Sequence, residues 1–384
     1  MANNNENKIL NVPHLRFPEF SGEWKKCKFG DIATGFDYGM NAAAKPFDGE
    51  NKYIRITDID EASSQYLYDD VVSPDGELGD SYLVKENDIL LARTGASTGK
   101  SYLYRNSDGK LYFAGFLIRA NIYKHNSYFV FSQLHTHRYK KWISVMSARS
   151  GQPGINSQEY ASFPLYTTSL QEEDKIASFL KLLDERIATQ NKIIEDLKKL
   201  KSAITNLLFH SIADAHTIRL GEIAHITNGA GDVQDANTEH QEDWYPFFDR
   251  SEELKWFPTY SFDKEAVIYA GEGQSFYPRY YNGKFALHQR CYAIMDFASC
   301  IIPKYCYHFM NTLNSYFVRN SVGSTVPSLR MDIFQKVEIR LPPIPKQQHI
   351  CKIIDAFYTK LEVEQRGISI LQELKQFLLS QMFI

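Results

Sequence analysis

Residues 94–101 are the part of the sequence whose residue types come nearest to a phosphate-binding loop. They read Thr-Gly-Ala-Ser-Thr-Gly-Lys-Ser, and a glycine-rich loop with this ending cradles phosphate when a helix follows it. Thr94 stands where the first glycine is required, however, and Tyr102-Leu103-Tyr104 predicts a strand. Without a helix N-terminus, nucleotide binding is not favoured. The segment is either a plain hairpin turn or a loop that offers side chains to DNA phosphates and bases, namely Arg93, Thr94, Ser97, Thr98 and Lys100.

Other chemically suggestive groups do not form a catalytic pattern. Pro74-Asp75 could begin a nuclease motif, but the next Glu-x-Lys is Glu173-Asp174-Lys175, in a predicted helix. The Asn-Pro-Pro or Asp-Pro-Pro tetrapeptide of adenine methyltransferases does not occur. His135 and His137 have the spacing of a strand face rather than of a helical zinc pair. We therefore expect no catalytic site, no metal and no cofactor.

Composition sets wide limits on the fold and on the location of the protein. The 384 residues suffice for two or three globular units, and the net charge of −3 does not advertise a nucleic-acid partner, although a basic face can hide in a neutral total. No apolar run reaches the roughly 18 residues that a membrane helix needs. The five cysteines are scattered and predict reduced core thiols. We expect a cytoplasmic protein without a membrane partner.

The sequence repeats itself. Phe29–Ala33 reappears as Leu220–Ala224, and each copy opens a long region rich in glycine and tyrosine. Further along, three more pairs of segments match in the same order. We expect the middle pair, Phe113-Ala114 and Phe285-Ala286, to open a strand in each half. The pairs are Asp88–Ala92 with Ala266–Ala270, Phe113-Ala114 with Phe285-Ala286, and Ser150–Ile155 with Ser324–Leu329.

Both halves end in a long helical pattern whose apolar positions step alternately by four and three. This a/d spacing predicts two long helices that pack antiparallel as a coiled coil, rather than two helices each buried on its own domain. The polar interruptions also match, Gln190 with Glu364 and Lys201 with Lys375. The first seam comprises Ile176, Leu180, Leu183, Ile187, Ile194, Leu197, Ile204 and Leu208, and the second comprises Ile350, Ile354, Phe357, Leu361, Ile368, Leu371, Leu378 and Met382.

The starts of the two helices carry recognisable residues. Ser169 and Glu172 form a potential capping box, and Pro345 is suited to the first helical position. The sequence thus predicts an α+β protein in which two mixed α/β domains alternate with two antiparallel helices, related by a pseudo-two-fold axis. The expected segments are an N-terminal segment 1–23, a first domain 24–168, a first helix 169–212, a second domain 213–343 and a second helix 344–384.

This plan resembles the specificity subunits of type I restriction–modification enzymes, in which two target-recognition domains alternate with two conserved helical regions. The resemblance covers nearly the whole chain and rests on the order and duplication of short segments that are weak individually. They are Leu15–Phe20 with Trp24, Tyr53–Ile59, Asp88–Lys100, Tyr245–Phe248, Gly283–Phe285 through His288–Arg290, Gly323–Pro327, Leu341–Ile344 and Gln347-Gln348. The first half departs from the pattern at Phe163–Tyr166, where the second has a double proline.

The resemblance implies a DNA-reading subunit without chemistry of its own. Each domain would bind one half of an asymmetric bipartite target in double-stranded DNA. The helices would dock two modification (methyltransferase) subunits, and restriction (translocase/nuclease) subunits would join that core. The alternative is a structural coiled-coil adaptor whose two domains bind protein or sugar.

Candidate DNA contacts are basic and amide side chains near aromatic residues, because Arg and Gln read guanine and adenine edges. Tyr277–Tyr281 is expected in the loop after Gly271–Gly273, and His288–Arg290 on the next strand. Arg138–Trp142 either grips the DNA backbone or is a solvated helix face. The full set is Arg55, Arg93, Thr94, Ser97, Thr98, Lys100, Gln152 and Asn156 in the first domain, and Arg250, Gln274, Arg279, Tyr280, His288, Gln289, Arg290, Ser324 and Thr325 in the second.

Overall fold

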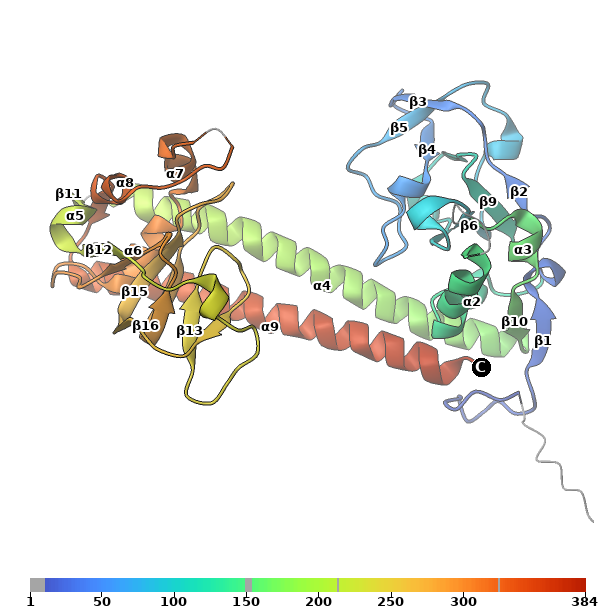
Figure 1. Cartoon of the computed structure of the whole chain (residues 1–384). Coiled ribbons are helices and arrows are strands. Elements are labelled where there is room, and N and C mark those ends of the chain that lie inside the picture. The colour runs from blue at the N-terminus through green and yellow to red at the C-terminus, as the bar shows by residue number, and fades with distance from the viewer. Residues whose placement is uncertain (1–10, 149–153, 213, 324) are drawn as a thin grey trace, which may run out of the picture. The chain divides into compact units, whose positions relative to one another are not determined.

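A computed structural model describes residues 11–148, 154–212, 214–323 and 325–384. The chain divides into two compact units (Figure 1). The first unit comprises the chain up to Asn191 together with Gly367–Ile384, and the second comprises Lys192–Arg366. Each unit therefore holds one α/β domain and a segment of each long helix. No helix among the described residues is long and apolar enough to cross a membrane.

The first unit is built around a four-stranded sheet in the order β2-β9-β6-β7, with the smaller pairs β1-β10, β3-β5 and β4-β8 around it. Its strands are β1 (Lys25–Lys28), β2 (Asp37–Tyr38), β3 (Ala43–Pro46), β4 (Lys52–Ile54), β5 (Val72–Asp75), β6 (Asp88–Ala92), β7 (Ser101–Leu103), β8 (Leu111–Phe113), β9 (Leu117–Asn121) and β10 (Pro164–Thr167). Its short helices are α1 (Ser127–Gln133), α2 (His137–Ser147) and α3 (Ser157–Ala161).

Strand β6 separates two hydrophobic cores, which explains why its sequence is a continuous apolar run. Ile89 and Leu91 belong to the core that contains Trp24 and the start of the first long helix, whereas Leu90 and Ala92 belong to the core under β4 and β8. Side chains alternate between the two faces of a strand, so both faces are covered here.

The second unit has one larger sheet in the order β12-β17-β15-β16-β13-β14 and a separate pair, β11-β18. Its strands are β11 (His216–Arg219), β12 (His225–Asn228), β13 (Tyr245–Phe248), β14 (Lys255–Phe257), β15 (Phe262–Ala270), β16 (Arg279–Leu287), β17 (Cys291–Met295) and β18 (Glu338–Leu341). Its short helices are α5 (Leu220–Ile223), α6 (Pro303–Met310), α7 (Asn314–Asn320) and α8 (Met331–Gln335).

Strand β15 repeats the arrangement of β6. Val267 and Tyr269 lie in the core shared with the long helices, and Ala266 and Ile268 lie in a second core on the other face. The predicted match between Asp88–Ala92 and Ala266–Ala270 is therefore confirmed as a pair of equivalent buried strand segments.

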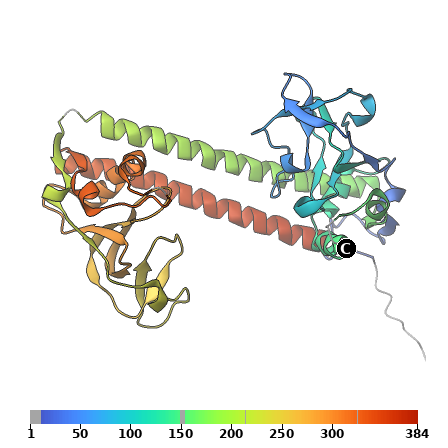
Figure 2. The same cartoon turned by 45° about the horizontal axis from the view of Figure 1, so that its top comes forward.

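The two long helices are α4 (Leu170–His210) and α9 (Ile344–Met382). In the first unit Asp184 of α4 pairs with Lys375 of α9 (2.6 Å), and in the second unit the Lys201 amine lies 4.1 Å from the Tyr358 ring centre. Asp184 in the N-terminal half of α4 thus contacts Lys375 near the end of α9, whereas Lys201 further along α4 contacts the earlier residue Tyr358 of α9. This order is that of antiparallel helices. The predicted antiparallel packing is confirmed within each unit, where the paired helix segments lie side by side in both views (Figures 1 and 2).

Every predicted seam position of α4 and α9 is buried or half-buried. Of the polar interruptions, Lys375 and Lys201 contact the groups on the other helix just described, Gln190 is 3% exposed, and Glu364 pairs with Lys360 of its own helix. The a/d spacing therefore marks the contact stripe, while the faces outside it remain largely exposed.

The helix starts differ in detail from the prediction. The Ser169 hydroxyl accepts a hydrogen bond from the Glu172 amide (3.3 Å), but the Glu172 carboxylate bonds other side chains instead of closing a capping box. Helix α9 begins at Ile344, so Pro345 is its second residue. The Glu172 carboxylate, which the local pattern predicts to cap the helix, is instead bound by Arg16, Trp24 and Thr168.

Three further local predictions are wrong. Phe113-Ala114 and Phe285-Ala286 fall at or near the ends of β8 and β16 instead of opening a strand. His135 and His137 flank the start of α2, where the Thr136 hydroxyl caps the helix, and do not share a strand face. Cys300 is exposed, whereas Cys291, Cys306 and Cys351 are buried as expected and Cys27 is half-buried.

An ion pair fastens the N-terminal segment of the first unit to the start of α4. The Arg16 guanidinium donates two hydrogen bonds of 2.7 Å to the Glu172 carboxylate, whose side chain is 1% exposed. Trp24 Nε1 and the Thr168 hydroxyl donate to the same carboxylate. Burial acts to raise the pKa of Glu172, but the hydrogen bonds from Arg16, Thr168 and Trp24 outweigh it and lower the pKa.

We expect Arg16→Met to lower the free energy of unfolding of the first unit by about 3 kcal/mol at neutral pH, because the buried Glu172 loses its charged partner. A carboxylate with a lowered pKa in the folded state contributes stability that is lost as the pH falls through that pKa. The difference between wild type and variant should therefore hold from pH 7 down to about 4.5, the ordinary pKa of a glutamate, and shrink as the pH falls further.

Urea unfolding followed by tryptophan fluorescence at several pH values measures this difference. Lys175→Met is the matched control, because the Lys175–Glu19 pair (3.1 Å) is half exposed and its loss should change the free energy by less than about 0.5 kcal/mol. A deficit in the Arg16 variant that does not depend on pH would show that only packing was lost.

Candidate nucleic-acid interface

The loop that imitates a phosphate-binding motif contains a short 3-10 turn, Gly95–Ser97, and leads into strand β7. The predicted strand after the loop is confirmed, and no helix N-terminus stands behind Lys100. The Lys100 amine instead lies 3.7 Å from the Glu61 carboxylate.

Two buried tyrosines hold this loop in place. The Tyr160 hydroxyl donates to the Ala92 carbonyl (2.6 Å) and accepts from the Gly99 amide, and the Tyr139 hydroxyl donates to the Gly99 carbonyl (3.1 Å). Gly99 has a φ of +92°, and a Cβ there would lie 2.8 Å from the Ile143 side chain. The loop is therefore fixed against α2 and α3.

Arg93 lies at the base of the loop, on the face of Tyr38. Its guanidinium carbon is 4.9 Å from the Tyr38 ring centre, and its Nε donates to the Gly115 carbonyl (3.1 Å). The side chain is thereby oriented before any ligand arrives. Thr94, Ser97 and Thr98 are half-buried around it.

Two other predicted contacts of the first domain have internal partners. Arg55 bonds Asp58 (2.7 Å) and Asp70 (3.0 Å), and these carboxylates raise its pKa. The Asn156 side chain caps α3 by accepting from the Glu159 amide (2.9 Å). Both side chains therefore already have partners within the first unit, and Gln152 lies outside the described residues.

In the second unit, Arg279 and Tyr280 open strand β16 and do not lie in the preceding loop as predicted. An Arg279 Nη donates to the Ser251 carbonyl, and the Tyr280 hydroxyl donates to Glu265. Both side chains therefore already have partners within the second unit, and as successive strand residues they lie on opposite faces of the sheet. Arg250, Gln274 and Thr325 are exposed, and Ser324 lies outside the described residues.

His288, Gln289 and Arg290 form the tight turn between β16 and β17, so the prediction that they lie on a strand is wrong. The Cys291 amide donates to the His288 carbonyl (2.9 Å) and closes the turn. The Arg290 guanidinium is exposed and ion-paired with Glu272 of the neighbouring loop (2.6 Å).

The same framework of loops occurs in both units, and we call it the loop cluster. In the first unit it comprises 38–40, 93–100, 113–117 and 154–156, and in the second it comprises 229–231, 271–274, 287–291 and 325–329. Five backbone hydrogen bonds of the first loop cluster have a counterpart in the second. The pairs are Arg93 N–Phe116 O with Gly271 N–Arg290 O, Ile155 N–Arg93 O with Leu329 N–Gly271 O, Gly115 N–Met40 O with Gln289 N–Gly231 O, Met40 N–Phe113 O with Gly231 N–Leu287 O, and Ala114 N–Ile54 O with His288 N–Phe248 O.

These bonds confirm part of the sequence repeat and correct another part. Ile155 and Leu329 are equivalent, as the match of Ser150–Ile155 with Ser324–Leu329 predicted. Phe113 is equivalent to Leu287 and not to Phe285, so that segment is shifted by two residues. Sequence reasoning consequently missed Phe116, Tyr38 and Glu272, because only the hydrogen-bond register shows which turn residues correspond.

Segment Arg138–Trp142, left open between a DNA grip and a solvated helix face, lies in α2. Arg138 lies over the Tyr166 ring (4.7 Å), Tyr139 is buried, and Lys140 and Lys141 are exposed. The segment is thus helical with two exposed lysines, and a contact of these lysines with the DNA backbone stays a prediction.

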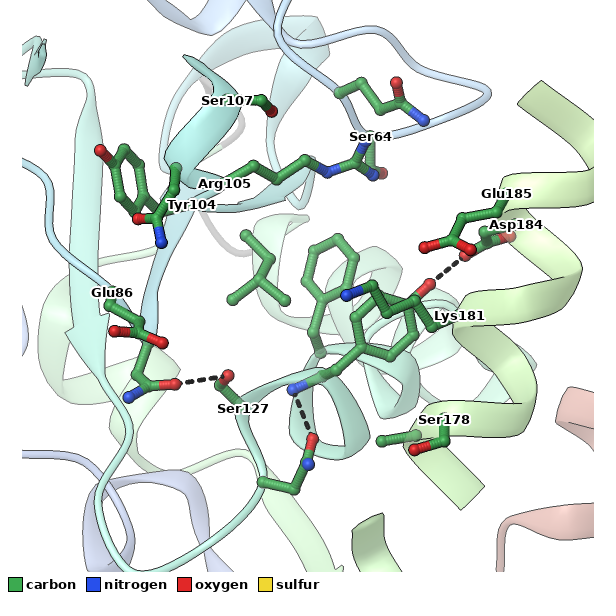
Figure 3. Close-up of a pocket in the computed structure, with 18 of the residues that line it drawn as sticks. Ser64, Glu86, Tyr104, Arg105, Ser107, Ser127, Ser178, Lys181, Asp184 and Glu185 are labelled. Atoms are coloured by element: carbon green, nitrogen blue, oxygen red, sulfur yellow. Dashed lines mark hydrogen bonds between the residues drawn. The ribbon is translucent and has the colours of Figure 1, made fainter. Parts of the chain in front are cut away.

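A pocket of about 660 Å³ separates the first domain from α4 (Figure 3). Arg105 and Lys181 extend into it, and Tyr128 at its wall donates a hydrogen bond to Asp184. Ser64 at its rim lies 3.0 Å from His135 Nε2, but His135 Nδ1 contacts the Phe131 carbonyl rather than a carboxylate, and burial lowers the His135 pKa to about 4. The pair is therefore a poor nucleophile and base.

No group of His, Cys, Asp and Glu side chains within the described part of the chain could hold a metal ion. The exposed, oriented side chains of the loop clusters are then the features that best fit recognition of a polar, charged macromolecule.

A family model described as "Type I restriction modification DNA specificity domain" matches residues 21–199 and 213–376. The type I restriction enzyme EcoDI specificity subunit of Escherichia coli is 31% identical over 165 residues, which are 43% of this chain and 36% of that protein. The match therefore spans about a third of the length of that relative.

Two solved structures share the fold. The S subunit of a type I restriction-modification system from M. genitalium has a TM-score of 0.65 at 16% identity, covering 97% of this chain and 99% of the other. A chain from a study of complex assembly and conformational transition of the type I R-M system has a TM-score of 0.58 at 15% identity, covering 94% and 97%. With the family model matching both halves, the chain belongs to the type I restriction modification DNA specificity family.

Proposed function

We propose that the chain reads an asymmetric bipartite target in double-stranded DNA, one half with each loop cluster, and performs no chemistry itself. The observation that carries this proposal is the repeated backbone framework with different exposed side chains on it. A fixed framework supplies the orientation that base readout requires, and differing side chains let the two halves of the target differ.

We propose further that the modification subunits dock on the long helices. The a/d seam is used up by the contact between α4 and α9, yet α9 has a second row of exposed apolar side chains at steps of seven, four and three, namely Val363, Ile370, Leu374 and Phe377. We call this row the α9 stripe. On α4, Leu182, Leu200 and Leu207 are similarly exposed. Exposed contiguous apolar surface marks protein interfaces.

Restriction subunits would then join this core, as the family resemblance implies. We propose that the chain acts in the cytoplasm, where the DNA that it would read lies, and that it has no membrane partner.

Salt dependence of duplex binding separates this function from that of a coiled-coil adaptor for protein or sugar. We expect the full chain to select particular duplexes from a random library, and their affinity to fall about 10³-fold or more between 50 and 200 mM salt if roughly six phosphates are contacted. Binding that shows neither sequence preference nor salt dependence would favour the adaptor.

The purified chain is expected to leave DNA unmethylated and uncut, because no group among its described residues could hold a metal ion and its sequence lacks the adenine-methyltransferase motif. Incubation with duplex DNA, Mg²⁺ and labelled S-adenosylmethionine measures both activities. Methyl transfer or cleavage that persists through further purification, and is lost on denaturing the chain, would contradict the proposal.

A further inference from the structure

The two loop clusters present different side chains at one equivalent position. Phe116 and Arg290 both accept a hydrogen bond through their carbonyl oxygens from the first residue after a buried strand, Arg93 after β6 and Gly271 after β15. Both lie in a tight turn that the amide of the next residue closes, Leu117 in the first unit and Cys291 in the second. Position 116 of the first unit therefore corresponds to position 290 of the second.

The turn that carries Phe116 is rigid. The Gly115 amide donates to the Met40 carbonyl (2.8 Å), and a Cβ on Gly39 would lie 2.2 Å from the Ala114 carbonyl oxygen. The Phe116 side chain is nevertheless 56% exposed. A rigid turn thus holds a large apolar group in solvent beside the stacked Arg93 and Tyr38.

At the equivalent position the second unit exposes a cation that is oriented by a carboxylate. Arg290 is 66% exposed, and Glu272, its ion-pair partner, is 20% exposed. Glu272 itself is fixed by strand-like pairing with Ser328. A carboxylate at this place disfavours phosphate, so the pair suits contact with base edges better than contact with the DNA backbone.

We propose that position 116/290 is a base-reading position common to both domains, at which Phe116 contacts the methyl group of a thymine and Arg290, positioned by Glu272, reads a guanine. The inference rests on the proposed DNA-reading function and deepens it. The chemistry follows from the major groove, where thymine presents an apolar methyl and guanine presents two acceptors that match an arginine.

Removal of the thymine methyl tests the first half. In selections from a random duplex library, the full chain should prefer thymine at one position, and Phe116→Ala should lower that preference about fourfold. Deoxyuridine at the same position should weaken wild-type binding by the same factor and leave the variant unaffected. Phe47→Ala is the matched control, because Phe47 is an exposed phenylalanine of the same unit outside the loop cluster.

The second half is tested by three variants at the ion pair. Arg290→Ala should lower the guanine preference roughly five- to hundredfold at one position of the other block. Arg290→Lys should keep total affinity but lose the preference, since an ammonium cannot bond both acceptors in one plane. Glu272→Gln should raise affinity for random DNA while lowering the guanine preference, a split that a merely structural carboxylate would not produce.

Different failures have different meanings. A wild-type chain that selects no sequence contradicts the proposed function itself. If the wild type selects two blocks, equal losses for deoxyuridine in the wild type and in Phe116→Ala would overturn the thymine contact, as would a Phe116→Ala effect that is uniform over all sequences. A uniform loss of affinity in Arg290→Ala would assign Arg290 to a phosphate and overturn the guanine contact.

Discussion

Replacing residues 24–164 by the corresponding domain of another specificity subunit is expected to change one half of the target completely and to leave the other half as it was. The cores on which the first domain packs lie within the first unit, and the hydrogen bonds that shape the second loop cluster lie within the second unit. Each mismatched base pair costs about 1–3 kcal/mol. Three altered positions should therefore shift the preference by roughly 10²- to 10⁶-fold.

The selected or methylated motif of the hybrid measures this effect. The reciprocal exchange of the second domain serves as the control and should alter only the other block. A hybrid that folds, binds DNA and shows changes in both blocks would mean that the units do not read DNA independently.

Charge on the α9 stripe should strongly weaken docking of the modification subunits. We expect Ile370→Asp combined with Leu374→Asp to weaken their binding about 10³-fold, because each buried apolar anchor of an interface contributes about 2 kcal/mol or more. Both side chains are exposed in the free chain, so folding and DNA binding by the chain itself should persist.

Co-purification with the modification subunits, together with methylation of the target, provides the measurement. Gln376→Asp is the control, since Gln376 is exposed but lies on a face of α9 away from the α9 stripe and the seam. Full methylation by the Ile370/Leu374 double variant would place the docking surface elsewhere.

The long helices could be predicted from the sequence because a/d spacing over some 40 residues is a dense and redundant pattern. Positions as far apart as Ile176 and Leu208 obey it, and the polar breaks are duplicated in the second helix. The buried strands β6 and β15 were predictable for a similar reason, since burial on both faces leaves a continuous apolar run.

The turns of the loop clusters could not be predicted in the same way. Arg290 lies in the turn after β16, which is held by backbone hydrogen bonds with Gly231, Phe248 and Gly271. These partners are distant in sequence, so no local residue pattern predicts them. The same holds for Phe116, whose equivalence to Arg290 appears only in the hydrogen-bond register. Glu172 is the opposite case. The local pattern predicts that its carboxylate closes a capping box, but the carboxylate binds Arg16, which is distant in sequence.

Methylome sequencing of a strain in which this chain is the sole specificity subunit supplied with modification subunits tests the central claim most directly. The account predicts one motif made of two short specific blocks separated by unread base pairs, which disappears when the chain is deleted. A single continuous motif, or a methylation pattern that is unchanged by the deletion, would contradict it.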